Sequence, residues 1–104
     1  MPGQPRCDEA LALAFEVLGK RWTGMLLGVL AEGDAGFAEL RRGIGGISDS
    51  VLSARITELV GTGLIEREPP DGLRYRLTAT GRALVPSLNE LTRWANAHLM
   101  PQRA

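Results

Sequence analysis

Apolar residues recur at helical spacing in five stretches of the chain, which predicts five helices. The expected helices cover residues 8–18, 21–31, 37–42, 48–61 and 79–99. The first is apolar around much of its circumference, which is typical of a helix buried on more than one side. Asp8, Ser48 and Thr78 are residue types that favour helix starts. Pro86 lies inside the last helix and is expected to kink it or to mark a local break.

Two short runs between the fourth and fifth helices have the pattern of strands. Residues 73–77 alternate apolar side chains with arginine, and residues 64–68 form a second short run. Pro-Pro-Asp-Gly at 69–72 is a strong turn sequence between them, and the glycine-containing stretch 33–36 is also predicted to be a turn. The expected fold is therefore mainly α with a small β-hairpin, in the order H-H-H-H-β-β-H.

This order contains a winged helix-turn-helix. A short glycine-rich turn at 43–46 joins the third helix to the fourth, and the hairpin follows the fourth helix directly. In such a unit the second helix of the pair, here residues 48–61, lies in the major groove of DNA. The hairpin, residues 64–77, then forms the wing beside it.

The fourth helix has small side chains on its outer side. When its apolar residues are placed inward on a helical wheel, the opposite side carries four residues that we call the polar face. These are Ser50, Ser53, Ala54 and Thr57. Serine and threonine can contact bases or phosphates, and alanine can contact a thymine methyl group. A merely solvated surface is the alternative interpretation, but small polar residues are poor helix formers and that interpretation does not explain them.

Basic residues surround the polar face in the sequence. All of them except Lys20 are arginine, whose planar guanidinium matches phosphate and guanine. With the first turn of the fourth helix, the candidate DNA contacts are Lys20, Arg41, Arg42, Ser48, Asp49, Ser50, Ser53, Ala54, Arg55, Thr57, Arg74 and Arg76. For the two hairpin arginines, the alternative is a solvated strand face on which they pair with Glu66 and Glu68.

Composition excludes several functional classes. The formal net charge is zero, from 12 basic and 12 acidic residues, so any DNA contact must depend on where the charges lie. The single cysteine, Cys7, and the single histidine, His98, exclude an intramolecular disulfide and leave a Cys/His zinc site without enough ligands. No phosphate-binding loop motif occurs. We therefore expect one domain over residues 1–104 that is not an enzyme and has no metal or cofactor.

The ends of the chain bear on where the protein acts. The N-terminal residues lack the apolar core of a signal peptide, and no apolar run approaches the roughly 20 residues of a membrane span. These observations predict a cytoplasmic protein without a membrane partner.

Several short motifs occur in a fixed order along most of the chain. They are Cys7 before the first helix, Gly19-Lys20-Arg21-Trp22, Phe37-x-x-Leu40-Arg41, Ile47-Ser48, Leu52-Ser53-x-Arg55-Ile56-x-x-Leu59, Gly63-Leu64-Ile65 and Tyr75-x-Leu77-Thr78-x-x-Gly81. Together they cover roughly residues 7–95 and resemble the HxlR-type winged-helix transcriptional regulators.

The resemblance implies a homodimer that binds double-stranded operator DNA with two-fold symmetry. It implies that the first helix (8–18) and the last (79–99) form the interface, for which the candidates are Leu11, Phe15, Leu88, Leu91 and Trp94. The function expected from it is sequence-specific regulation of transcription, as a repressor. The alternative is a winged-helix module for protein–protein contact, which the zero net charge favours.

The resemblance also implies an effector. Several relatives sense oxidants, quinones or other electrophiles through a cysteine at the position of Cys7, and a helix N-terminus with Arg6 adjacent would favour the thiolate. The alternative is a half-buried packing residue, since free cysteine often behaves as a small apolar side chain. A second candidate effector is a small molecule held between subunits by Trp22, Trp94 and Phe15.

Overall fold

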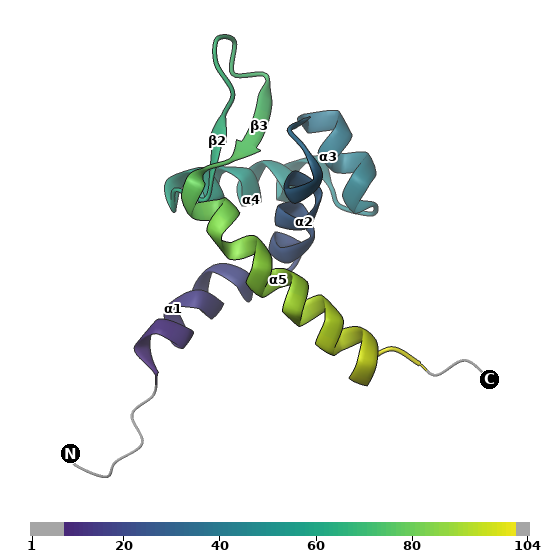
Figure 1. Ribbon diagram of the computed structural model, residues 1–104. Coiled ribbons are helices and arrows are strands. Elements are labelled where there is room, and N and C mark those ends of the chain that lie inside the picture. Colours follow the sequence, from purple (N-terminus) through teal and green to yellow (C-terminus); the bar gives the residue numbers. More distant parts are fainter. Residues whose placement is uncertain (1–7, 102–104) are drawn as a thin grey trace.

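The computed structural model describes residues 8–101, which form five helices and three short strands (Figure 1). In chain order these are α1 (Glu9–Leu18), α2 (Thr23–Glu32), β1 (Ala35–Gly36), α3 (Phe37–Ile44), α4 (Asp49–Gly61), β2 (Ile65–Arg67), β3 (Arg74–Leu77) and α5 (Ala79–His98). The expected fold class, mainly α with a winged helix-turn-helix, is confirmed. None of the helices in residues 8–101 is long and apolar enough to cross a bilayer.

One apolar core holds α2 to α5 and the sheet together. Its buried members are Leu26, Leu27, Leu30, Ala35, Leu40, Ile44, Ile47, Leu52, Ile56, Leu59, Ile65, Tyr75 and Leu77. By contrast, α1 has no buried residue and projects from the body of the molecule (Figure 1). The expectation that the first helix is buried on more than one side is therefore not met within one chain.

Side-chain caps set the helix starts that the sequence predicts. Asp8 Oδ1 accepts hydrogen bonds from the backbone N–H groups of Ala10 and Leu11, at 3.0 and 3.2 Å. Ser48 Oγ accepts from the N–H of Val51 at 3.2 Å, which fixes the start of α4.

The sheet is antiparallel with the strand order β1-β3-β2. Ile65 pairs with Leu77 and Arg67 pairs with Tyr75, as expected for the hairpin. The prediction of a simple turn at 33–36 is wrong, because Ala35 pairs with Tyr75 and adds a third strand. A strand of two residues is too short to show an alternating pattern, and its formation depends on β3 being present.

Three features of the helices differ from the predictions. Helix α2 begins at Thr23 because Trp22 has a left-handed backbone, with φ at 82°. Helix α3 continues to Ile44, whose side chain is buried. Helix α5 runs without a break through Pro86, which is exposed, so water can bind the carbonyl group that lacks a helical partner.

The wing and α5 are joined by a close approach of backbones. A Cβ added at Gly81 would lie 2.1 Å from the carbonyl oxygen of Leu64, so only glycine allows α5 to begin against the chain that leads into β2. Just before that chain segment, Gly63 has a φ of 82°, as predicted for a residue that ends the fourth helix. The base of the wing is therefore fixed on both of its sides.

Candidate nucleic-acid interface

The polar face of α4 is exposed as the helical wheel predicts. All four of its residues are exposed, whereas Leu52 is fully buried and Ile56 and Leu59 are 3% exposed. Thr57 Oγ1 donates to the backbone carbonyl of Ser53 at 3.0 Å, so its hydroxyl lies against the helix. The polar face thus carries only short side chains, which would let the helix come close to the floor of a nucleic-acid groove.

A cation and an anion are paired at the N-terminal end of this surface. Arg41 Nη1 lies 2.8 Å from Asp49 Oδ1, and both side chains are half exposed. Arg42 is exposed and makes no ion pair with any residue in the described part of the chain. Of the two arginines predicted at this end, Arg42 is therefore the one with a free guanidinium.

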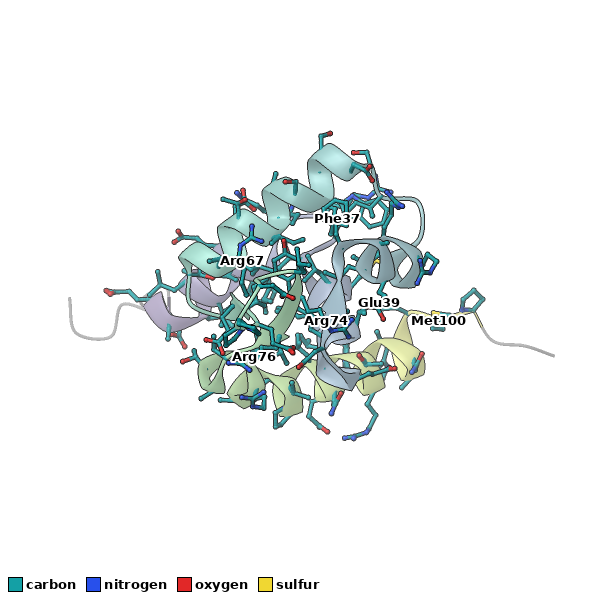
Figure 2. All side chains as sticks on the ribbon, turned by 90° about the horizontal axis from the view of Figure 1, so that it is seen from above. Phe37, Glu39, Arg67, Arg74, Arg76 and Met100 are labelled. Atoms are coloured by element: carbon teal, nitrogen blue, oxygen red, sulfur yellow. The ribbon has the colours of Figure 1, made fainter. Side chains whose placement is uncertain are left out.

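The wing arginines are paired with acids, one on α3 and one on β2. Arg74 Nη1 lies 2.7 Å from Glu39 Oε1, and its Nη2 donates to the carbonyl oxygen of Asp34 at 2.6 Å. Arg76 Nε donates to Glu66 Oε2 at 2.7 Å. Figure 2 looks down on the wing and shows Arg74 beside Glu39, with Arg67 and Arg76 around the hairpin. The pairing of Arg76 with Glu66 matches the alternative interpretation of the hairpin.

Glu39 is held in its ionised form by this arrangement. The backbone N–H of Gly36 donates to its carboxylate at 2.8 Å, and Arg74 donates to the same oxygen. First the Gly36 hydrogen bond and then Arg74 lower the pKa of Glu39 below its ordinary value. Arg74 therefore joins the wing to the start of α3.

Lys20 and Arg55, both predicted DNA contacts, share one carboxylate. Lys20 Nζ lies 2.8 Å from Glu58 Oε2, and Arg55 Nη1 lies 3.1 Å from Glu58 Oε1. Arg55 Nε also donates to the carbonyl oxygen of Arg21 at 3.1 Å, and the Arg55 side chain is only 20% exposed. The structure thus directs Arg55 toward the residues that precede α2 rather than outward with the polar face.

Sequence reasoning missed the acidic partners in this region. The carboxylates of Glu39 and Glu58 were not among the predicted site residues, although each contacts one that was. Asp34, also missed, contacts Arg74 through its backbone carbonyl. The Arg55 and Glu58 pair could have been found, because residues three apart are neighbours on a helix. The other pairs join residues 35 to 40 positions apart, and no local pattern indicates them.

Glu68 has an unusual environment where β2 leads into the turn of the wing. Its Oε2 is shielded from solvent and has no hydrogen-bond partner in the part of the chain that the structure describes. The adjacent carboxyl group of Asp34, and then burial, raise the pKa of Glu68 above its ordinary value, against the opposing effect of Arg74 and Arg76. Two ionised carboxylates repel here, and a single proton would let them form a hydrogen bond.

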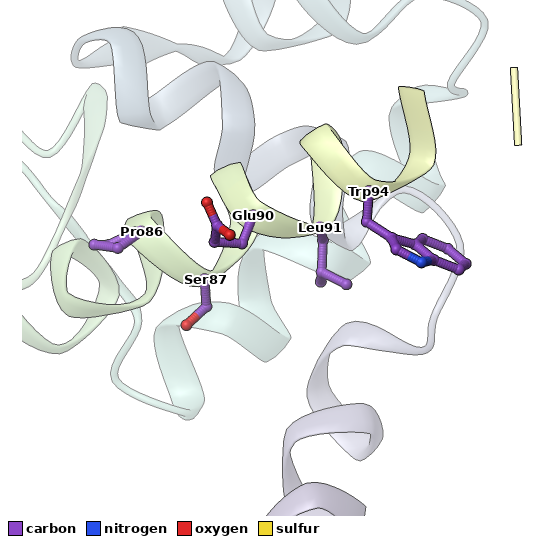
Figure 3. A pocket seen from close by; sticks show the side chains of 5 residues that line it. All are labelled: Pro86, Ser87, Glu90, Leu91 and Trp94. Atoms are coloured by element: carbon purple, nitrogen blue, oxygen red, sulfur yellow. The ribbon is translucent and has the colours of Figure 1, made fainter. Parts of the chain in front are cut away.

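The predicted interface residues lie on exposed helix surfaces. Leu11 and Phe15 on α1 are 55% and 52% exposed, and Leu91 and Trp94 on α5 are 46% and 53% exposed. Leu88 is half-buried against the core. Ser87, Leu91 and Trp94 project from one side of α5 and, with Pro86 and Glu90, line an open groove of about 540 Å³ (Figure 3).

The predicted effector residues are not gathered in one chain. Trp22 packs against the core, and a Cβ at Gly46 would lie 3.8 Å from its ring. Trp94 instead lies beside His98, with ring centroids 5.8 Å apart. Cys7 lies outside the described residues. Within residues 8–101 there is no group of three or more His, Cys, Asp or Glu side chains that could hold a metal ion.

The chain matches known proteins along most of its length. Residues 17–103 match the model of the HxlR-like helix-turn-helix family. The HTH-type transcriptional regulator YodB of Bacillus subtilis is 37% identical over 103 residues, covering 95% of this chain and 91% of YodB. YvaP of the same organism, an uncharacterized HTH-type transcriptional regulator, is 34% identical over 101 residues, covering 93% of this chain and 90% of YvaP.

Solved structures with similar folds include redox regulators. The reduced form of YodB superposes with a TM-score of 0.79 at 33% identity, covering 94% of this chain and 99% of that one. Quinone-bound YodB has a TM-score of 0.77 at 35% identity, covering 86% and 98%. The redox regulator HypR in its reduced form has a TM-score of 0.78 at 27% identity, covering 85% and 91%.

The raised pKa of Glu68 predicts a specific pH dependence of stability. Because the folded state binds this proton more tightly than the unfolded state, stability from this group is present at low pH. That stability is lost as the pH rises from the ordinary glutamate range through the raised pKa. Glu68→Gln removes the repulsion, so its melting temperature should exceed that of the wild type at pH 8, by a margin that shrinks toward pH 5.

Circular dichroism melts at pH 5 and pH 8 measure this difference. Glu16→Gln, at an exposed site on α1, is the control and should shift the melting temperature equally at both pH values. A Glu68→Gln protein that melts below the wild type at pH 8 would contradict the interpretation.

Proposed function

Because the chain belongs to the HxlR-like helix-turn-helix family of transcriptional regulators, which are not enzymes, we propose that it is a homodimeric repressor that binds operator DNA sequence-specifically. The observation that carries the proposal is the division of α4 into a buried side and an exposed polar face. A surface of serine, alanine and threonine on a helix held rigidly by Leu52 suits insertion into the major groove. The protein would then act on DNA in the cytoplasm.

The first turn of α4 would contact both bases and phosphates. Ser50 is exposed there, and the helix N-terminus favours phosphate because its N–H groups carry partial positive charge. Arg41 is paired with Asp49 in the free protein, but an exposed ion pair contributes only about 0–1 kcal/mol, so exchange for a phosphate costs little. Arg42 can contact a phosphate without breaking an ion pair.

The wing would contact the backbone beside the groove that α4 enters. Arg74 and Arg76 lie on the outward side of β3, where they could exchange their carboxylate partners for phosphates. Arg74 also joins the wing to α3, and Arg76 joins the two strands of the wing. We therefore assign them a weaker role in binding than Arg42 and the polar face.

A homodimer accounts for the exposed apolar side chains of α1 and α5. Leu91 and Trp94 form one patch on α5, and Leu11 and Phe15 form another on α1. Contiguous apolar surface of this kind marks an interaction site, and a second copy of the chain would cover both patches. A dimer with two-fold symmetry would present its two α4 helices about 34 Å apart to successive turns of DNA.

Electrophiles or oxidants are the effectors that we propose. One relative, YodB, has been solved in quinone-bound and diamide-treated forms, and another, HypR, is named a redox regulator. Cys7 precedes α1, whose exposed side belongs to the proposed dimer interface. Modification of the thiol would then change how the two subunits meet. A small molecule between the subunits, contacting Phe15 and Trp94, is the alternative effector.

Replacement of Ala54 by glutamate should weaken DNA binding. A carboxylate on the polar face would meet the phosphates and base edges of the groove, so affinity should fall roughly tenfold or more. Ala31→Glu is the matched control, because Ala31 is exposed at the end of α2 beside α5. Gel shifts at one stated salt concentration, on DNA from the protein's own upstream region, measure the effect.

The same assay separates DNA binding from the alternative function. If neither wild type nor variant shifts DNA at protein concentrations well above micromolar, and neither is retained on heparin, the winged helix would be a protein–protein module instead.

Replacement of Leu91 by glutamate should dissociate the dimer. A charge at the centre of an apolar interface should weaken association by at least about 2 kcal/mol, as for loss of a hot-spot residue. Leu73→Glu is the control, since Leu73 is 71% exposed on the wing and lies outside the proposed interface. Sedimentation velocity should give a dimer for the wild type and the control, and a monomer for Leu91→Glu. A monomeric wild type would refute the proposal.

Replacement of Cys7 by serine should abolish the response to electrophiles. Diamide or a quinone should change the DNA affinity of the wild type and leave that of Cys7→Ser unchanged, because serine provides no thiolate. Gel shifts before and after treatment measure both proteins. An equal response in the two would exclude Cys7 as the sensor.

A further inference from the structure

Helix α4 is attached to the residues that connect α1 to α2. The connection, residues 19–22, lies between Leu18 at the end of α1 and Thr23 at the start of α2. Two contacts join it to α4: Lys20 to Glu58, and Arg55 to the carbonyl oxygen of Arg21. A third contact, from Glu58 to Arg55, lies within α4 and links the other two. We call these four residues the Glu58 clamp.

Glu58 is the centre of the clamp because each of its oxygens binds a different cation. Oε2 accepts from Lys20 Nζ at 2.8 Å, and Oε1 accepts from Arg55 Nη1 at 3.1 Å. The hydrogen bond from Lys20 comes first among the causes that lower the pKa of Glu58, so the carboxylate is ionised at neutral pH. A bridging carboxylate constrains both cations at once, which a single exposed ion pair does not do.

Arg55 completes the clamp by holding the backbone of the connection. Its Nε donates to the carbonyl oxygen of Arg21 at 3.1 Å, and that carbonyl belongs to the peptide bond before Trp22. Trp22 has a φ of 82°, a strained conformation for a residue other than glycine, which persists only when its surroundings enforce it. The clamp therefore acts at the one position of the connection where the backbone is strained.

Trp22 gives the connection a second contact with the DNA-binding unit. A Cβ at Gly46 would lie 3.8 Å from the Trp22 ring, which places the ring against the turn before α4. The connection thus contacts the recognition helix through the clamp and the preceding turn through Trp22. Its neighbour α1 has no fully buried residue and packs against the core only through Val17 and Leu18 at its C-terminal end.

We propose that Glu58 is a positioning residue that holds the recognition helix to the α1–α2 connection, so that the placement of α1 sets the placement of the polar face. Glu58 does not contact DNA in this role. Lys20 and Arg55 serve the same purpose and are not primarily DNA contacts, which revises the prediction made for them from sequence. The proposal rests on the proposed function insofar as the polar face of α4 is what reads DNA.

The direction in which DNA affinity changes in Glu58→Gln distinguishes a positioning role from a purely electrostatic one. The substitution removes a negative charge from the recognition helix, so electrostatics alone predicts tighter binding to any DNA. Loss of the clamp predicts the opposite for specific DNA: affinity for the upstream fragment should fall roughly tenfold, the equivalent of one base contact. Affinity for a shuffled fragment of the same length should not fall.

Arg55→Lys and Glu32→Gln are the companion variants. Lysine keeps the positive charge but cannot donate to both Arg21 and Glu58 with the geometry of a guanidinium, so Arg55→Lys should reproduce the loss of specificity. Glu32→Gln changes the net charge equally at the exposed end of α2 and should leave the ratio of specific to nonspecific affinity unchanged. Unchanged or tighter specific binding in both clamp variants would overturn the proposal.

Amide hydrogen exchange tests the clamp without DNA. Glu58→Gln should accelerate exchange in residues 20–23 and in α4 together, and Glu32→Gln in neither. Unchanged exchange in both segments of Glu58→Gln would overturn the proposal, whatever the DNA result. If the wild type shows no preference for the upstream fragment, the proposed function fails while the exchange experiment still decides whether Glu58 positions α4.

Discussion

The burial of one side of α2 fixes the position of the elements around it. Leu26, Leu27 and Leu30 are at most 3% exposed, and burial of each such side chain contributes about 1.5–3 kcal/mol. Helix α2 contacts the next helix, α3, and also β3 and α5, which come much later in the sequence. Its close packing with α3 depends on Gly43, where a Cβ would lie 3.2 Å from the Val29 side chain. The turn before α4 and the base of the wing are thereby held to one rigid helix.

The elements that depend on local sequence were the ones that could be predicted. Side-chain caps and apolar periodicity gave the starts and inward faces of the helices, because both act within a few residues. The strand β1 and the left-handed backbone of Trp22 could not be predicted in this way. Each depends on partners from elsewhere in the chain: β1 on Tyr75, and Trp22 on the carbonyl contact made by Arg55.

In the candidate interface, the exposure of the polar face could be predicted from the sequence, but most of the ion pairs could not. The polar face followed from the helical wheel, since the buried position of Leu52 determines which residues face outward. Of the carboxylate partners, Glu66 was named from the sequence as an alternative for the hairpin arginines. Glu39 and Glu58 were not, because an exposed guanidinium and a paired one have the same sequence pattern. Glu39, Glu58 and Glu66 each bind a basic residue that the sequence predicted as a DNA contact.

This pairing is consistent with a net charge of zero in a DNA-binding protein. Cations that are bound to carboxylates attract nonspecific DNA weakly, because the acids that hold them also repel phosphate. Binding would then depend on the shape and small size of the polar face more than on charge. Such a surface tolerates little misplacement, since short side chains cannot extend to recover a lost contact. A recognition helix of this kind needs rigid support, and the Glu58 clamp provides it where α4 meets the connection to α1.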